Sequence, residues 1–393
     1  MLSLHRGHSH VAAFAGAVLL VVGVASPALA QTIGGEQLAS PHRTVSLLPG
    51  ASPLPKVKAD TWILADATTG DVLAQKGSHV RRAPASTLKM LTALTVMPKT
   101  TPDQVVRPST AAAGTYGSRV GLKPGRAYTL DELWYAVFLP SANDAAIAVA
   151  EANGGVRATV EQMNQVAHRL QADDTVAKTP NGLDTTGQVS SAYDLALIGR
   201  AGMARPDFAK YAGTVKAMFP DRKGKASHPI YTTNRLLRHG YSGMTGVKTG
   251  FTSHAGRTYV GMATRHGTTL IVTLMGIHES SEYAARKLLD WGFANRNKVT
   301  PIGQLVTPLA ADSGESTTAS AQADPSATAS GADDPSSRNG TRSDLTARAP
   351  ATVSMAMLGG AGLVAMAIAG ASFVTVRLRR RDGRPDREPP DLA

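Results

Sequence analysis

Cysteine is absent from all 393 residues of the chain. The protein therefore forms no disulfide, and a thiol nucleophile or a thiolate-bound metal centre is excluded. Acidic residues (29) are fewer than basic ones (41), which leaves a formal net charge of +12. The basic residues are scattered or lie near the C-terminal end, without interleaved aromatic residues, so we expect no nucleic-acid partner. The histidines lack the paired spacing of metal ligands, so we expect no metal and no cofactor.

The first 30 residues have the order of a secretory signal. Arg6 precedes an apolar run over 11–24, and Pro27-Ala28-Leu29-Ala30 supplies a cleavage site of the A-x-A type. The apolar run is about 14 residues long, which is short for a membrane span and disfavours an uncleaved signal anchor. We expect 1–30 to be a signal peptide and 31–56 to be an N-terminal linker.

The C-terminal end has the pattern of a membrane anchor. Residues 351–376 are almost wholly apolar and contain no charge, which is enough for the roughly 20 helical residues that cross a bilayer. Four arginines follow at once: Arg377, Arg379, Arg380 and Arg381. Because positive charge is retained on the cytoplasmic side, we expect a transmembrane helix over 351–376 that runs from outside to inside, with a basic cytoplasmic tail over 377–393.

The segment before this anchor has the composition of a spacer. Residues 307–350 consist mainly of Ser, Thr, Ala, Asp and Pro, with few large apolar residues. Such a segment cannot bury enough apolar surface to offset the entropy lost on ordering. We therefore expect a disordered stalk over 307–350, which leaves 57–306 for one folded domain.

Three short strings within that domain have the residue types of a serine acyl-transfer site. They are Ser86-Thr87-Leu88-Lys89, Ser141-Ala142-Asn143 and Lys248-Thr249-Gly250. Together they supply a nucleophile, a base, a proton relay and an anion anchor, although each string alone is weak evidence. Residues three apart share a helix face, so Ser86 and Lys89 are expected to point the same way.

The hydrophobic periodicity predicts an α+β fold. Two strands over 62–67 and 71–75 are joined by a turn at Thr68-Thr69-Gly70. A helix follows from Pro84, and a capping box at Thr129 predicts another that ends at Pro140. The remaining expected elements are helices over 144–152, 156–170, 192–203 and 281–293 and strands over 246–250, 258–263 and 268–275. This order predicts a sheet built from both chain ends with a helical lobe inserted between them.

From about Trp62 to Phe293 the chain resembles the low-molecular-mass penicillin-binding D-alanyl-D-alanine carboxypeptidases. The likeness includes Ala83-Pro84-Ala85-Ser86, Leu139 to Ala146, Pro180-Asn181-Gly182-Leu183 and Gly246 to Gly250. The resemblance implies a β-lactamase or penicillin-binding transpeptidase-like fold, with an antiparallel sheet flanked by helices. It also implies removal of the terminal D-alanine from peptidoglycan stem pentapeptides, and acylation by β-lactams. With the end signals, it places the catalytic domain on the wall side of the bacterial cell membrane.

The resemblance also assigns roles to individual residues. It makes Ser86 the nucleophile, Lys89 the base with a lowered pKa, Ser141 the proton relay and Asn143 the residue that positions Lys89 and the substrate amide. These four are the expected catalytic residues.

Four further residues are expected to bind the substrate. Lys248 and Thr249 bind the terminal carboxylate, Gly250 permits close backbone approach, and the N–H of Phe251 completes an oxyanion hole with that of Ser86.

Two positions depart from the pattern of some family members. Phe251 stands where they have histidine, and Thr233 stands where they have a basic residue before Asn234. The backbone N–H at 251 survives the first change, so we expect acylation to survive as well. The departures therefore bear on carboxylate binding and on the rate of deacylation.

Two other functions fit the same strings. A class A-like β-lactamase shares them, but no Glu-x-x-x-Asn string stands between Asn143 and Lys248 to activate a hydrolytic water. A non-enzymatic penicillin sensor or wall-binding protein would need an intracellular output domain, and 377–393 is too short and polar to form one. Both alternatives are therefore disfavoured but remain open.

Overall fold

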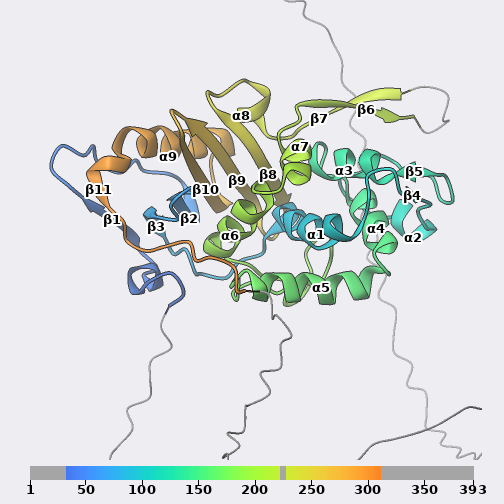
Figure 1. Cartoon of the computed structure of the whole chain (residues 1–393), viewed down its shortest axis with the longest axis horizontal. Helices are drawn as coiled ribbons and strands as arrows, with labels where there is room; N and C mark the ends of the chain where they lie inside the picture. Colours follow the sequence, from blue (N-terminus) through green and yellow to red (C-terminus); the bar gives the residue numbers. More distant parts are fainter. Residues whose placement is uncertain (1–31, 222–226, 311–393) are drawn as a thin grey trace, which may run out of the picture. The chain divides into compact units, whose positions relative to one another are not determined.

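A computed structural model describes residues 32–221 and 227–310. Its centre is a seven-stranded sheet with the order β11-β1-β3-β2-β10-β9-β8, in which every neighbouring pair is antiparallel (Figure 1). The strands are β1 (Arg43–Leu47), β2 (Ala59–Asp66), β3 (Val72–Lys76), β8 (Met244–Thr252), β9 (Gly256–Arg265), β10 (Thr268–Ile277) and β11 (Val299–Thr300). The prediction of an antiparallel sheet built from both chain ends is confirmed.

Strand β2 is buried on both faces because helices cover both sides of the sheet. Its alternate residues Ile63 and Ala65 belong to the core on the side of α1 (Lys89–Val96) and α6 (Ala192–Met203). Trp62 and Leu64 belong to the core under α9 (Ser281–Asn295). The period of two along a strand thus distributes one hydrophobic run between two cores.

The turn between β2 and β3 forms as predicted. The N–H of Thr68 donates to Asp66 Oδ1 over 2.9 Å, and the N–H of Gly70 donates to the Asp66 carbonyl over 2.8 Å. Gly70 has φ +89°, a backbone conformation that residues with a Cβ rarely adopt. This short connection sets the β2–β3 register and therefore the start of the sheet.

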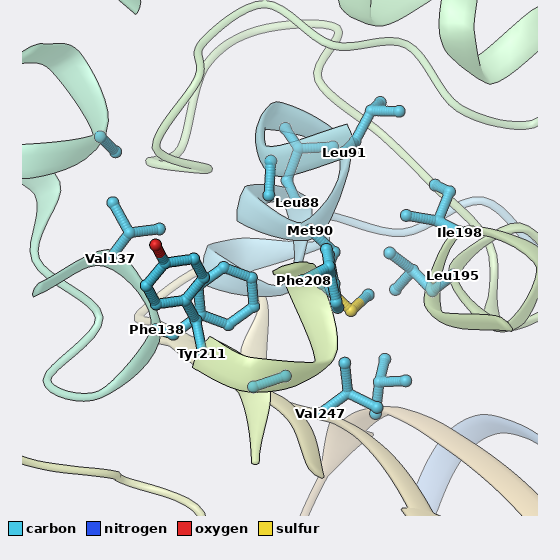
Figure 2. Packing of buried hydrophobic residues seen from close by; sticks show 14 of the residues in the cluster. Leu88, Met90, Leu91, Val137, Phe138, Leu195, Ile198, Phe208, Tyr211 and Val247 are labelled. Carbon is cyan, nitrogen blue, oxygen red and sulfur yellow. The ribbon is translucent and has the colours of Figure 1, made fainter. Parts of the chain in front are cut away.

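A helical lobe is inserted between β3 and β8. Helix α1 lies at its centre, and Figure 2 shows Leu88, Met90 and Leu91 packed among side chains from the neighbouring elements. The lobe contains α2 (Thr110–Ala113), α3 (Leu130–Phe138), α4 (Asn143–Ala152), α5 (Val156–Arg169), α6 and α7 (Pro206–Ala212). Thr129 and Glu132 form the predicted capping box of α3. The predicted helical lobe is thus confirmed.

The remaining described elements are short. They are the strand pairs β4 (Val105–Val106) with β5 (Tyr128–Thr129) and β6 (Lys216–Pro220) with β7 (Ser227–Tyr231), helix α8 (Arg235–Arg238), and the 3₁₀ turns η1 (Glu36–Ala39), η2 (Ala85–Leu88), η3 (Met97–Lys99) and η4 (Arg296–Lys298). The β6–β7 pair and α7 had no counterpart among the sequence expectations.

Two expectations need correction. Residues 31–56 are not merely a linker, because β1 lies within them and pairs with both β3 and β11. Its sequence, RTVSL, has the half-exposed character of a strand near the sheet edge and no strong apolar alternation. The helix expected from Pro84 begins only at Lys89 and is preceded by η2, because Ala85 has φ +49° and interrupts regular helix.

The predicted signal peptide (1–30), transmembrane helix (351–376) and cytoplasmic tail (377–393) lie outside the described residues, as does the predicted stalk apart from residues 307–310. Among residues 32–221 and 227–310, no helix has the length and apolarity needed to cross a membrane.

Candidate active site

Ser86 lies in the 3₁₀ turn η2, immediately before helix α1. Two hydroxyl groups fix this turn: Thr87 Oγ1 donates to the Pro84 carbonyl over 2.6 Å, and Thr258 Oγ1 from β9 donates to the same oxygen over 2.9 Å. Gly182 passes so close that a Cβ there would lie 2.0 Å from the Ala85 carbonyl oxygen. The position of Ser86 is therefore set by contacts from two distant segments.

Lys89 is fully buried and contacts three oxygen atoms. Its Nζ lies 2.8 Å from Ser86 Oγ, 2.7 Å from Asn143 Oδ1 and 2.6 Å from the Asn181 carbonyl oxygen. Asn143 Nδ2 donates to the Tyr116 carbonyl over 2.8 Å, which fixes the amide so that Oδ1 faces the lysine. The predicted Ser86–Lys89 proximity is present, and the Asn181 carbonyl is an addition to the expected site.

The pKa of Lys89 lies well below its ordinary value. Burial is the main cause, since it disfavours the charged ammonium, and the positive charge of Lys248 lowers the pKa further. The negative charge of Asp144 acts in the opposite direction. A lysine in this environment can present a neutral amine with a lone pair, which is the form that accepts a proton.

Ser141 and Asn143 come from the connection between α3 and α4. Ser141 has φ +62°, so the backbone reverses sharply there, and Asn143 is the first residue of α4. Asp144 accepts hydrogen bonds from the N–H groups of residues 120, 121 and 122 over 3.2, 2.8 and 3.0 Å. This carboxylate therefore holds the loop beside the site against the start of α4.

Lys248 lies on β8 and is 1% exposed. Its Nζ donates to Ser141 Oγ over 2.8 Å and to the Thr249 carbonyl over 2.9 Å. Burial lowers the pKa of Lys248 to about 7. Thr249 Oγ1 lies 2.6 Å from Thr233 Oγ1, so two hydroxyl groups stand together beside the buried cation.

A cleft of about 550 Å³ opens over these groups. Gly250 lies on its floor, where a Cβ would be 2.8 Å from the Ser86 nitrogen, so β8 approaches the Ser86 turn as closely as expected. Phe251 is 66% exposed at the rim, and the Arg257 guanidinium lies 5.8 Å from the centre of its ring. The lining residues include Ser86, Ser118, Ser141, Thr233, Arg235, Thr249, Gly250, Phe251, Arg257 and Glu282.

The structure brings all eight expected site residues to this cleft. Five of them line it, and Lys89, Asn143 and Lys248 lie buried beneath it. Lys89 contacts Ser86, Lys248 contacts Ser141, and Asn143 contacts Lys89. Asp144 and Asn181 also contribute to the site, through the contacts described above, although no role was expected for either. Both lie inside the strings that carry the resemblance. Arg257 of β9 also lines the cleft.

One group in the described part of the chain has metal-ligand spacing. Ligand atoms of His79, Asp174 and Asp194 lie within 4.8 Å of one another, but none of these residues lines the cleft. His79 contacts Asp174 over 2.8 Å and the Ile33 carbonyl over 3.0 Å, and Asp194 accepts from Thr175 over 2.7 Å. These contacts explain the cluster as a partly buried hydrogen-bond network.

Comparison with known proteins agrees on one family. A family model described as D-alanyl-D-alanine carboxypeptidase matches residues 49–279. The D-alanyl-D-alanine carboxypeptidase DacB2 of Mycobacterium tuberculosis is 40% identical over 263 residues, which span 65% of this chain and 89% of that protein. DacF of Bacillus subtilis is 33% identical over 245 residues, 60% of this chain and 62% of that protein.

Two solved structures, a carboxypeptidase and a transpeptidase, also align with the chain. A crystal structure of a D-alanyl-D-alanine carboxypeptidase from M. tuberculosis H37Rv aligns with a TM-score of 0.62 and 38% identity, covering 66% of this chain and 99% of that one. The Streptomyces K15 DD-transpeptidase aligns with a TM-score of 0.59 and 29% identity, covering 62% of this chain and 100% of that one.

Proposed function

Because the chain belongs to the D-alanyl-D-alanine carboxypeptidase family, we propose that it removes the terminal D-alanine from peptidoglycan stem pentapeptides through an acyl-enzyme on Ser86. The observation that supports this most directly is the buried Lys89 amine, 2.8 Å from Ser86 Oγ. A serine hydroxyl is a weak nucleophile until an adjacent base takes its proton.

The contacts of Lys89 suit it to act as that base. Asn143 Oδ1 and the Asn181 carbonyl can only accept hydrogen bonds, so they take the two N–H groups of a neutral amine. The lone pair then faces the third neighbour, the Ser86 hydroxyl. Since burial favours the neutral form, Lys89 can take the Ser86 proton as Oγ forms its bond to the substrate carbonyl carbon.

The remaining groups complete the acylation step. The N–H groups of Ser86 and Phe251 stabilise the carbonyl oxygen as it becomes negative. The C–N bond then breaks as the departing D-alanine amine takes the hydroxyl proton of Ser141, which is hydrogen-bonded to Lys248. The proton that Lys89 took from Ser86 passes to Ser141 and restores its hydroxyl, so Lys89 is neutral again. Water attacks the resulting ester, releases the shortened peptide and restores the Ser86 hydroxyl.

The terminal carboxylate of the substrate binds beside Lys248, Thr249 and Thr233. A carboxylate next to Lys248 stabilises the charged ammonium, which burial alone disfavours. Thr233 supplies only a hydroxyl where some relatives have a cation. Arg257 lines the same cleft and has no carboxylate partner among residues 32–221 and 227–310, so it supplies positive charge. Arg235, in contrast, is paired with Glu282 over 3.3 Å.

We also propose that the enzyme acts on the outer side of the cell membrane. The signal pattern over 1–30 and the apolar segment over 351–376, followed by arginines, support this orientation. In intact cells, protease added outside should then degrade the catalytic domain while an epitope fused after Ala393 stays protected. Protection of the catalytic domain as well as the epitope would contradict the proposal.

The activity is tested by incubating the purified protein with a stem pentapeptide that ends in D-Ala-D-Ala. We expect release of one D-alanine per peptide, and loss of release in Ser86→Ala at unchanged thermal stability. Penicillin should form a stable adduct that mass spectrometry places on Ser86. Rapid turnover of penicillin without D-alanine release would instead identify a β-lactamase, and wall binding without either reaction would identify a receptor.

A further inference from the structure

A second cleft of about 440 Å³ adjoins the Ser86 turn. Pro84, two residues before Ser86, lines it, as do Gly182 and Asp184 from the loop that passes behind the turn and His254 from the turn between β8 and β9. The two clefts thus share the turn that bears the nucleophile. The proposed reaction uses only the first.

The proposed binding mode determines where the rest of the substrate lies. The terminal carboxylate is bound at Lys248 and Thr249, and the acyl carbonyl lies at the N–H of Phe251. The peptide therefore runs antiparallel to β8, which ends the strand order of the sheet, and its upstream part continues past Thr252. An extended residue spans about 3.3 Å, so the residue before the acylating D-alanine lies beside 252–254, where the second cleft opens.

The unpaired charge that lines this cleft is negative and belongs to Asp184. Asp184 Oδ1 accepts a hydrogen bond from Thr252 Oγ1 over 2.7 Å, and its Oδ2 has no partner among residues 32–221 and 227–310. The two arginines that line the cleft are already paired. Arg81 contacts Asp174 over 3.1 Å, and Arg82 forms an ion pair with Asp60.

We propose that the second cleft binds the side chain of the residue that precedes the acylating D-alanine, and that Asp184 selects a side chain ending in a primary ammonium. This proposal rests on the proposed carboxypeptidase function and adds a specificity-determining residue to it. Asp184 acts on substrate binding alone, because it contacts β8 through Thr252 and lies outside the Ser86–Lys89–Asn143 network.

Two synthetic peptides test the proposal on the unaltered protein. One is Nα-acetyl-L-lysyl-D-alanyl-D-alanine with a free ε-amine, and the other is the same peptide with that amine acetylated. An ion pair with an exposed carboxylate gives up to about fivefold in binding, so kcat/KM for the free amine should be about fivefold higher. Raising the salt concentration should reduce the difference.

Two variants distinguish an effect of the Asp184 charge on substrate binding from a general effect of removing a negative charge. Asp184→Asn keeps an oxygen for Thr252 and should abolish the preference while leaving kcat/KM for the acetylated peptide unchanged. Glu161→Gln, which makes the same charge change on an exposed residue of α5, should retain the preference. Equal kcat/KM for both peptides in the wild-type protein, or an equal loss for both in Asp184→Asn, overturns the subsite. Release of D-alanine from neither peptide overturns the carboxypeptidase function itself.

Discussion

The contact between Gly182 and the Ser86 turn leads to a sharp prediction. A Cβ at Gly182 would lie 2.0 Å from the Ala85 carbonyl oxygen and 3.2 Å from the Ser86 nitrogen. Contacts below 3.0 Å are essentially never observed for a real Cβ, so in Gly182→Ala the two backbones must separate by about 1.0 Å. Both segments are main chain, and no flexible side chain can absorb the change.

Two effects follow, with different magnitudes. Gly182 has φ +77°, and a residue with a Cβ costs about 1–2 kcal/mol in that conformation. This cost should lower the melting temperature by a few degrees. Displacing the nucleophile by about 1 Å should in addition lower the rate of acylation by about 10²-fold, because reaction requires close alignment of the attacking atom.

Gly187 in the same loop provides a matched control. It has φ +78°, but its added Cβ would meet only Lys178 Cε at 3.7 Å, which is ordinary contact. Gly187→Ala should therefore lose only the stability that the positive φ costs, and should keep its acylation rate. The assay is stopped-flow acylation by a fluorescent penicillin, alongside calorimetry. If Gly182→Ala is acylated as fast as Gly187→Ala, the Gly182 contact does not position Ser86.

Three further outcomes are expected. Burial lowers the Lys248 pKa from 10.5 to about 7, so between these pH values the unfolded chain binds more protons and the free energy of unfolding rises with pH. Lys89, whose pKa is also lowered, contributes a rise of the same sign. Denaturant unfolding should therefore show a rise in Lys248→Met that is smaller than the wild-type rise by about 3–6 kcal/mol, and an equal rise in both proteins would contradict the burial of the Lys248 charge. Arg257→Ala should raise KM about fivefold at unchanged kcat, and an equal fall in kcat would contradict its role in binding. Asn143→Ala removes an acceptor from Lys89 and should lower kcat by about 10²-fold or more; steady-state D-alanine release at wild-type rate would contradict this.

The elements with regular hydrophobic periods are those that the sequence predicts well. Helix α6 begins and ends at the expected residues, because its apolar residues recur at helical spacing and Ser191 caps it. The β6–β7 pair escaped prediction because its strands contain Pro220 and Pro229, and proline weakens a strand pattern. Strand β1 escaped because its partners β3 and β11 lie far away in the sequence.

The contact between Ser86 and Lys89 is present as expected, although the backbone that carries it differs from the expected α-helix. The spacing of three places both side chains on one face of an α-helix, yet Ser86 lies in a 3₁₀ turn and only Lys89 in α1. Residues three apart are aligned even more closely in a 3₁₀ turn, so the contact survives the change. No local sequence pattern predicts the φ of +49° at Ala85, because the turn is held by contacts with the distant residues Gly182 and Thr258.

The chemistry of Lys89 depends on burial more than on its hydrogen bonds. Asn143 Oδ1 and the Asn181 carbonyl accept from the ammonium as readily as from the amine, so they orient Nζ without favouring the neutral form. Burial is the largest cause of the lowered pKa, and the chain segment around Gly182 provides part of it. Gly182→Ala should therefore also admit water and raise the Lys89 pKa. Because the amine must be neutral to act, the acidic limb of the pH profile of acylation should move to higher pH in Gly182→Ala and stay in place in Gly187→Ala.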